Sequence, residues 1–408
     1  MAAASTPIEP THDRAPVATP VPVPVVVATL ALCGVLVVSQ LYVTIPLAPV
    51  VGRVFGVSPL AAAWIGSAFG FAYALGNLVF GPLSDRYGRL GVLVPGLAAL
   101  AVATLAVGAS PSFPALVALR ALQGFVGATF PPAALAYLAE TLPPRARATG
   151  IAVVSAGFLL AGLVGQIYAG ALAPAYGWRW VFWALVGTLV LAVAAIRRLP
   201  AGTAQRASPV TLRQAFARMA PLLGAGPLLV VYAVSLALLL PFVAMYSGLD
   251  AVATGRYGIA GGGLTLLRLA GLPGILLSPL AGGLIHRYGA RVVARAALLL
   301  AAGGLVLEAA PSSLVVLLIG SGVFVAGIAA AVPAVISLVS ALGGDARGAA
   351  IALYGCLIFV GASLGPLVAT MLRPAGFAVL CLALAAMLLV AAGVLPRRGG
   401  RRLSGGDA

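Results

Sequence analysis

Long apolar stretches alternate with short polar breaks along most of the chain. A helix that crosses a bilayer needs about 20 mostly apolar residues, and twelve windows of that kind are present. The breaks between them carry arginine, glycine or proline. We therefore predict an all-α integral membrane protein whose twelve transmembrane helices cover residues 24–46, 60–82, 90–109, 114–138, 148–173, 179–196, 220–246, 258–283, 292–310, 314–341, 349–372 and 376–395.

The composition agrees with a protein that is surrounded by lipid. Hydrophobic residues make up 62% of the 408 residues and charged residues only 8%, whereas a soluble domain carries roughly 25% charged residues. The formal net charge is +16, and every Lys/Arg position is an arginine. A basic chain can bind nucleic acid, but these arginines lie in short breaks between apolar windows. The expected partner is therefore the lipid bilayer and no nucleic acid.

The positions of the arginines predict the orientation of the chain. Cytoplasmic loops of membrane proteins carry an excess of arginine and lysine. If both termini are cytoplasmic, 18 arginines lie on the cytoplasmic side, and the four on the other side are Arg53, Arg179, Arg256 and Arg373. We therefore predict a multi-pass protein of the cell (inner) membrane with both termini in the cytoplasm.

The sequence repeats itself at an offset near 200 residues. The segment GPLSDRYGR at 81–89 recurs as GGLIHRYGA at 282–290, and Gly165 is matched by Gly365. Tandem repeats of this kind are typical of secondary transporters. The prediction is two pseudo-symmetric six-helix halves, with a disordered cytoplasmic tail at 1–22, an N-terminal half at 23–196, a cytoplasmic linker at 197–219, a C-terminal half at 220–395 and a cytoplasmic tail at 396–408.

Polar side chains are distributed unevenly among the windows. The third, sixth and twelfth windows almost lack them, and the ninth carries them only near its ends. The other eight windows carry Ser, Gln, Tyr, Asn or Arg at depth. We predict that the four mainly apolar helices form a scaffold that faces the lipid and that the other eight helices surround a central polar path.

Three motifs resemble the major facilitator superfamily, and within it the twelve-helix drug:proton antiporter-1 group. The segment 81–89 between the second and third windows matches the superfamily's G-x-L-x-D-R-x-G-R loop. The segment Arg120-Ala-Leu-Gln123-Gly124 in the fourth window is similar to its R-x-x-Q-G motif. A glycine-rich run in the fifth window is the third signal. The resemblance covers roughly residues 30–395 and implies a major-facilitator-like fold that works by alternating access.

The resemblance also implies a gate at the cytoplasmic face. Asp85 would meet the start of the eleventh span near Gly348 when that face is closed, because the N-terminal end of a helix attracts a carboxylate. His286 occupies the repeat position and lacks that attraction, so we expect an asymmetric latch; the alternative is a charged topological anchor. The predicted gate residues are Gly81, Asp85, Arg86, Gly88, Arg89, Glu140, Arg145, Arg147, His286 and Arg287.

Two glycine-containing pairs are predicted to pack helices together. Antiporters of this group usually show Gly-Pro in the fifth span, whereas this chain has Gly165-Gln166 there. The Gly-Pro pair occurs in the second half instead, as Gly365-Pro366. This difference between the halves is a departure from the pattern of the antiporters.

Two arginines lie inside spans. A charge within a transmembrane helix costs about 2.5–3.5 kcal/mol on insertion scales and marks a functional site by default. The resemblance implies a role for Arg120 in proton coupling or substrate binding, and Arg268 lies outside its motifs. Two guanidinium groups near the centre would suit an anionic or carbonyl-rich substrate. The alternative for each is a structural arginine that pairs with backbone carbonyls or a polar neighbour.

No carboxylate is expected at mid-membrane. We place Glu140 near the cytoplasmic end of the fourth span, where it clusters with Arg145 and Arg147, and Asp250 in an outer loop. Glu308 falls near the outer end of the ninth span, where we expect it to reach toward the membrane surface. Proton coupling therefore follows from the resemblance alone.

The remaining residues indicate a binding cavity for an amphiphilic small molecule. The sequence contains no nucleophile–base pair at depth, no ATP-binding signature and no metal-ligand spacing of its two histidines and three cysteines, so we predict no enzyme, no cofactor and no metal. The function expected is proton-coupled efflux of a drug-like compound or metabolite by a monomer, with uptake or exchange of an organic anion, with or without protons, as the alternative. The predicted substrate and coupling residues are Arg120, Arg268, Gln40, Tyr42, Gln123, Tyr232, Phe324 and Tyr354.

Overall fold

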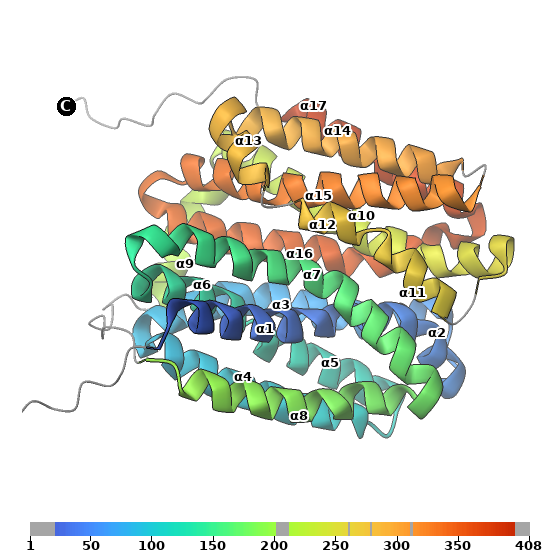
Figure 1. Ribbon diagram of the computed structural model, residues 1–408, viewed down its shortest axis with the longest axis horizontal. Coiled ribbons are helices and arrows are strands. Elements are labelled where there is room, and N and C mark those ends of the chain that lie inside the picture. The colour runs from blue at the N-terminus through green and yellow to red at the C-terminus, as the bar shows by residue number, and fades with distance from the viewer. Residues whose placement is uncertain (1–20, 201–211, 260–261, 278–279, 311–312, 396–408) are drawn as a thin grey trace, which may run out of the picture.

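Long helices aligned along one axis make up the protein (Figure 1). The computed structural model describes residues 21–200, 212–259, 262–277, 280–310 and 313–395. Within these residues eleven helices are long and apolar enough to cross a membrane, and a bent pair of helices supplies a twelfth span. The prediction of an all-α membrane protein with twelve transmembrane helices is confirmed, while the predicted tails fall almost wholly outside the described residues.

The first six spans form the N-terminal half. They consist of α1 (Val23–Tyr42) with α2 (Thr44–Phe55), α3 (Pro59–Tyr87), α4 (Arg89–Gly108), α5 (Phe113–Gly127) with α6 (Phe130–Thr141), α7 (Pro144–Tyr176) and α8 (Trp178–Arg197).

The next six spans form the C-terminal half. They consist of α10 (Gly226–Tyr257), the broken span of α11 (Gly262–Leu269), α12 (Leu272–Leu276) and α13 (Leu280–Tyr288), α14 (Ala290–Ala309), α15 (Leu314–Leu342), α16 (Arg347–Leu372) and α17 (Phe377–Val394). Part of the predicted linker is helical, because α9 occupies Leu212–Met219. Its apolar residues Leu212, Phe216 and Met219 follow the spacing of one helix face.

Proline explains two breaks within spans. Pro46 has no N–H for the carbonyl of Tyr42, and its ring crowds that carbonyl, so α1 ends there and α2 begins. Pro131 has the same effect on Gly127 between α5 and α6. In the eighth span the axis bends by 43° between Gly263–Leu276 and Leu280–Tyr288.

Several helices extend beyond the apolar windows that predicted them. The first span continues to Phe55 instead of residue 46, and the seventh covers Gly226–Tyr257 instead of 220–246. Backbone hydrogen bonding continues where hydrophobicity ends, so Arg53 and Asp250 lie within helices. Window hydropathy marks the apolar part of a helix and not its terminus.

The two halves repeat each other in backbone conformation. Equivalent caps use glycine with positive φ, a region that a Cβ makes costly. The matched φ values are 64° and 62° at Gly56 and Gly258, 83° and 85° at Gly88 and Gly289, and 89° and 92° at Gly177 and Gly376. The predicted pseudo-symmetry therefore extends to the shape of the connections.

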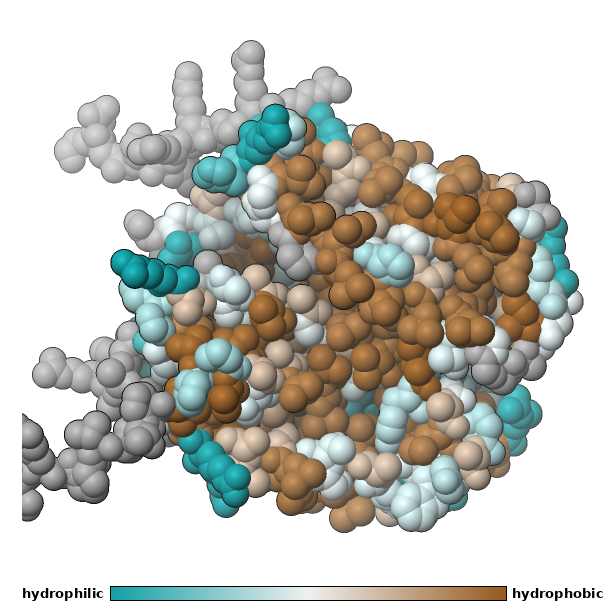
Figure 2. All heavy atoms as spheres, in the orientation of Figure 1, coloured by the Kyte–Doolittle hydropathy of each residue, from teal (hydrophilic) through white to brown (hydrophobic). Residues whose placement is uncertain are grey.

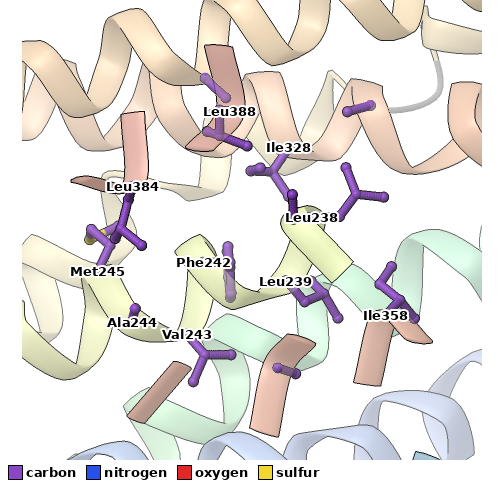
Figure 3. Packing of buried hydrophobic residues seen from close by; sticks show 14 of the residues in the cluster. Leu238, Leu239, Phe242, Val243, Ala244, Met245, Ile328, Ile358, Leu384 and Leu388 are labelled. Carbon is purple, nitrogen blue, oxygen red and sulfur yellow. The ribbon is translucent and has the colours of Figure 1, made fainter. Parts of the chain in front are cut away.

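The third, sixth, ninth and twelfth spans lie at the margins of the bundle. In Figure 1, α4 and α8 run along one edge, and α14 and α17 run along the opposite edge. This agrees with the scaffold inferred from their lack of polar residues. The core of the C-terminal half is aliphatic, and Figure 3 shows Leu238, Phe242 and Met245 of α10 among residues of α15, α16 and α17.

The surface of the bundle is apolar in the middle and hydrophilic at its two ends. Figure 2 shows apolar side chains across most of the visible face, with hydrophilic side chains gathered toward the two ends. We call the end that carries Arg86, Arg89, Arg145 and Arg147 the arginine-rich end, and the end where α2 joins α3 and α7 joins α8 the arginine-poor end.

Candidate functional site

A small pocket lies between the two halves. In this conformation it is narrow, with a cavity volume of about 10 Å³, and it is lined by Tyr42, Leu159, Leu239, Phe242, Ile275, Val325, Ile328 and Ala329. The first two come from α1 and α7, and the others come from α10, α12 and α15. The rings of Tyr42 and Phe242 meet edge to face with centroids 5.9 Å apart. The lining is apolar apart from the phenol of Tyr42, which suits a largely apolar small molecule.

The two aromatic residues of this pocket are equivalent in the repeat. Tyr42 was predicted to line the cavity, whereas Phe242, 200 positions later, was not. The internal repeat was the signal that could have identified Phe242, because it is the repeat partner of Tyr42. The aliphatic members of the lining carry no motif, and only the packing of the two halves brings them together.

The guanidinium of Arg120 is fully buried and bound by the N-terminal half alone. Its Nε donates to the carbonyl of Ile65 at 3.0 Å, and one Nη donates to the carbonyl of Gln40 at 2.8 Å. The other Nη donates to Oε1 of Gln123. The rings of Phe69 and Phe182 lie 4.4 and 5.6 Å from its Cζ. Arg120 thus cross-links α1, α3 and α5.

A network of uncharged side chains continues from Arg120. Gln123 donates through Nε2 to Oε1 of Gln40 and, at 2.8 Å, to Oγ1 of Thr104. Thr104 donates to Oε1 of Gln40 at 3.0 Å. The predicted site residues Gln40, Arg120 and Gln123 therefore meet, in a closed network with Thr104 that sequence reasoning missed. Within the described residues Arg120 has no carboxylate partner, so its charge is stabilised by carbonyls and ring faces.

Arg268 is paired with an acid that the sequence analysis misplaced. Asp250 was expected in an outer loop, but it lies in α10 and forms a salt bridge with Arg268 of α11. The exposed fraction of the side chain is 2% for Arg268 and 25% for Asp250. The seventh span is longer than its apolar window, which explains the error.

Glu308 was also misplaced. We expected it to reach toward the membrane surface, but its side chain is fully buried. Its Oε2 lies 3.8 Å from Sγ of Cys381 in α17, and its Oε1 has no hydrogen-bond partner among the described residues. The ninth span packs tightly against α15 and α17 at this level, so that the side chain points between helices instead of outward.

The other predicted lining residues lie outside the described pocket. The hydroxyl of Tyr232 donates to the carbonyl of Ala350 at 3.3 Å, and that of Tyr354 lies 3.5 Å from the carbonyl of Val332. Phe324 is fully buried at the close approach of α15 and α14. Substrate binding by these three residues remains a prediction, and it would require another conformation of the bundle.

The predicted gate forms a charged cluster within the N-terminal half. Arg89 binds Asp85 and also donates to Oε1 of Glu140 at 3.0 and 2.6 Å through Nε and Nη2. Arg89 also binds the Ser84 hydroxyl at 2.7 Å. Glu140 therefore contacts Arg89, and not the Arg145 and Arg147 that we expected beside it.

The rest of the predicted gate is open. The Asp85 side chain is 53% exposed, and a Cβ added to Gly348 would meet nothing within 4 Å. His286 and Arg287 of α13 are exposed. The equivalent arginines Arg86 and Arg287 each lie over the following tyrosine ring, at 5.5 and 5.2 Å. The contact between Asp85 and the start of α16 is not made in this conformation.

The glycines of the predicted packing motifs lie where helices approach closely. Gly165 in α7 faces the backbone of Ser39 in α1, and Gly365 in α16 faces Val243 in α10, at equivalent positions of the two halves. Gln166 is buried and donates to the carbonyl of Gly162 at 2.7 Å. Pro366 lies 3.7 Å from the Cβ position of Gly66 in α3.

The two halves meet along α3 and α16. Ser67 donates to the carbonyl of Ser363 at 2.7 Å, and the rings of Tyr73 and Phe359 have centroids 4.4 Å apart. Nearer the arginine-poor end, Nη1 of Arg268 lies 2.8 Å from the Cβ position of Gly170 in α7. These contacts close the arginine-poor end.

Comparisons with known proteins agree with this architecture. The chain matches the profile of the Major Facilitator Superfamily over residues 30–274, more than half of its length. A probable transporter of Streptomyces coelicolor is 31% identical over 67% of this chain and 64% of its own length. The tetracenomycin C resistance and export protein of Streptomyces glaucescens is 35% identical over 29% of this chain and 22% of its own. The chain thus matches less than two thirds of either relative.

Solved structures show the same fold. The human organic anion transporter MFSD10 (TETRAN) superposes with a TM-score of 0.73 over 92% of this chain and 100% of that one, at 21% identity. A bacterial homologue of the human lysosomal transporter Spinster, inward-facing and occupied, gives a TM-score of 0.70 at 17% identity. From the helical bundle, the repeated halves and the match over residues 30–274, the chain belongs to the Major Facilitator Superfamily of transporters.

Proposed function

We propose that this transporter exports a small, largely apolar compound in exchange for protons, by alternating access of a site between its two halves. The observation that carries this proposal is the apolar pocket around Tyr42 and Phe242. No charged side chain is among its lining residues. A neutral or weakly polar substrate enters such a pocket without leaving a buried charge unpaired.

The two buried arginines support a neutral substrate over an anion. Arg120 already satisfies two carbonyls and Gln123, and Arg268 is paired with Asp250. An anion would have to displace these partners. Removing one partner from a buried charge costs about 3–5 kcal/mol, so neither guanidinium is available to a substrate at low cost.

The names of relatives point in the same direction. Besides the tetracenomycin C resistance and export protein, the chain is similar to the efflux pump radE of Floropilus chiversii, which is 35% identical over 32% of this chain and 24% of its own length. Export is the activity these two names share.

The proposed orientation places the arginine-rich end in the cytoplasm. The 18-to-4 distribution of arginines supports both termini on that side of the inner membrane. In this orientation the closed arginine-poor end faces outward, and the half-exposed Asp85 belongs to an open cytoplasmic side. The described conformation would then accept substrate from the cytoplasm, as an exporter requires.

Two fluorescent probes with one aromatic skeleton test the proposal. N-phenyl-naphthylamine is neutral, and anilinonaphthalene sulfonate adds one negative charge. Cells that overproduce the protein should accumulate less of the neutral dye than control cells, and Phe242→Ala should reduce the difference. In proteoliposomes a pH gradient should drive transport of the same dye. Selective transport of the sulfonate, or transport of the neutral dye that ignores the gradient, would contradict the proposal.

A second candidate is uptake or exchange of an organic anion without protons. The position of Arg268 at the contact between the halves favours it, because its guanidinium would bind a carboxylate or sulfonate well once Asp250 released it. In that case overproducing cells should accumulate the sulfonate, and Arg268→Ala should abolish its accumulation. The two probes therefore separate the candidates in one experiment.

A further inference from the structure

A cluster of buried polar groups lies near the arginine-poor end of the C-terminal half. It shares no residue with the pocket but borders it, because the rings of Tyr246 and Phe242 have centroids 5.1 Å apart. Five helices supply it: Tyr246 and Asp250 come from α10, Arg268 from α11, Glu308 from α14, Ser321 from α15 and Cys381 from α17. All but Asp250 are almost fully buried. The proposed export function assigns none of these residues a task.

The cluster contains several polar atoms without a partner among the described residues. They are Nε of Arg268, Oδ1 of Asp250 and Oε1 of Glu308. Buried polar groups are nearly always hydrogen-bonded, and leaving one unpaired is unfavourable. Arg268, Asp250 and Glu308 therefore each have an atom that is able to take a further partner.

The charges of the cluster do not balance unless one carboxyl is protonated. It contains one guanidinium and two carboxyl groups. Asp250 holds the guanidinium of Arg268 in a salt bridge. Glu308 contacts only the thiol of Cys381 through Oε2, and its Cγ lies 2.9 Å from the Cβ position of Gly320. An ionised carboxylate sealed there without a cation would be strongly unfavourable, so Glu308 is the carboxyl that carries the proton.

The groups that face Glu308 come from every helix packed around it. Cys381 lies on α17, Ser321 on α15 and Tyr246 on α10. Asp250 lies one helical turn beyond Tyr246 on α10. Among titratable groups of α13, His286 and Arg287 lie at the opposite end of α14. Arg256 and Arg373 at this end are exposed, so Arg268 is the buried arginine of the cluster.

Arg268 connects the cluster to the other half of the molecule. Its Nη1 lies 2.8 Å from the Cβ position of Gly170 in α7, so a residue larger than glycine would collide with it there. When the halves separate at this end, α7 leaves the guanidinium and water enters. Arg268 is then free to turn from Asp250 toward Glu308.

We propose that Glu308 is a proton-binding site that controls the arginine-poor end, being protonated when the end is closed and ionised when it is open. On opening, the O–H bond of the carboxyl breaks and its proton passes to the entering water. The electron pair stays on the carboxylate, and Arg268 neutralises the new charge. Closure therefore binds a proton, and acid favours the closed end.

The test measures the distance between two spin labels across the arginine-poor end, in lipid nanodiscs and without substrate. Ala175→Cys on α7 and Gly255→Cys on α10 are exposed positions of the two halves. Cys33 and Cys356 are replaced by alanine. Cys381 is kept because it touches Glu308. A control protein that lacks the two introduced cysteines shows how much spin label Cys381 itself takes up. In the protein whose Glu308 and Asp250 are unchanged, the distance between the two labels should be short at acidic pH and should lengthen as the pH rises.

Two carboxamide variants of the same cluster identify the proton site. Glu308→Gln should keep the distance short at every pH, because the side chain cannot ionise. Asp250→Asn should retain a pH response, because Glu308 is still present. A wild-type distance that ignores pH, or a normal response in Glu308→Gln, would overturn the proposal. Loss of the response in Asp250→Asn alone would assign the proton to Asp250.

A measurement on the unmodified residue covers the case in which Glu308→Gln does not fold. The infrared carbonyl band of a protonated carboxylic acid should be present in the labelled protein at acidic pH. It should disappear over the pH range in which the distance lengthens. Absence of this band would also overturn the proposal. Neither measurement uses a substrate, so the result is independent of whether the protein exports apolar compounds in exchange for protons.

Discussion

At the scale of single residues, two buried arginines that look alike in the sequence have different surroundings. Arg120 lies among carbonyls and aromatic rings, and Arg268 forms an ion pair. The first arrangement fixes three helices of one half to one another. The second lies at the contact between the halves, where Gly170 leaves room for it. The first is thus suited to holding a structure and the second to changing partners.

The role of Arg120 can be tested with a conservative replacement. Lysine keeps the charge but cannot reach the carbonyls of Ile65 and Gln40 and the amide of Gln123 with one planar group. Each acceptor left without a donor costs about 1–3 kcal/mol. We expect Arg120→Lys to lower the apparent melting temperature of the detergent-solubilised protein, followed by tryptophan fluorescence.

The partly buried Arg179 provides the matched control. It makes one hydrogen bond, of 3.2 Å, to the carbonyl of Ser110, and Arg179→Lys should change the melting temperature little. If Arg120→Lys melts normally but no longer transports, Arg120 has a direct role in transport instead of a structural one.

At the scale of helices, the two halves share their caps and differ in their charges. Gly88 and Gly289 start α4 and α14 with nearly the same φ and ψ. The residues just before them differ, because Asp85 stands where the second half has His286. The shared backbone preserves the fold, and the different side chains allow only the first half to place a carboxylate near the start of α16.

This asymmetry predicts unequal effects of two equivalent substitutions. Asp85→Asn removes a charge that a helix N-terminus stabilises by about 1 kcal/mol, which shifts a conformational equilibrium about fivefold. Transport should fall, and labelling of cysteines at the arginine-rich end should increase. His286→Asn should leave both nearly unchanged. Equal effects of the two variants would show that the latch is symmetric.

Close helix packing gives a second prediction at this scale. A Cβ at Gly365 in α16 would lie 2.8 Å from Cβ of Val243 and 3.0 Å from the backbone N of Ala244. We expect Gly365→Ala to lower thermal stability, since backbone atoms cannot give way as a flexible side chain can.

Gly187 in α8 is the control for this packing. A Cβ at Gly187 meets nothing within 4 Å, and alanine favours a helix over glycine by about 1 kcal/mol. Gly187→Ala should therefore raise the melting temperature slightly. A similar response of both variants would mean that helix propensity, and not packing, decides the outcome.

At the scale of the whole molecule, the structure is closed at one end. Contacts between α3 and α16 and between α7 and α11 hold the arginine-poor end together, while the gate cluster of Asp85, Arg89 and Glu140 stays within one half. An alternating-access transporter must break the first set of contacts during each cycle.

A cross-link across this contact should stop the cycle. The side chain of Ser67 reaches the backbone of Ser363 at 2.7 Å, so cysteines at both positions are close enough for a disulfide after small adjustments. In a background without native cysteines, oxidation of Ser67→Cys/Ser363→Cys should abolish transport, and a thiol reductant should restore it. Each single variant controls for the substitutions themselves, and continued transport by the cross-linked protein would rule out separation of the halves at this contact.

The sequence by itself determined the class, the number of spans, the repeat and the motifs. These follow from local properties, because about 20 apolar residues must form a membrane helix and a tandem repeat shows as matching segments such as 81–89 and 282–290. Even Phe242 was within reach of the sequence through its repeat partner Tyr42.

Only the tertiary structure decided which polar side chains meet. Asp250 and Arg268 are 18 positions apart on different helices, and Glu308 and Cys381 are 73 positions apart. The apolar windows were too short to place Asp250 within a helix, and hydropathy near a helix end does not distinguish a side chain that reaches the surface from one sealed between helices. Burial and pairing depend on how neighbouring helices are rotated and how closely they pack, and these properties belong to the assembled bundle and not to any one segment.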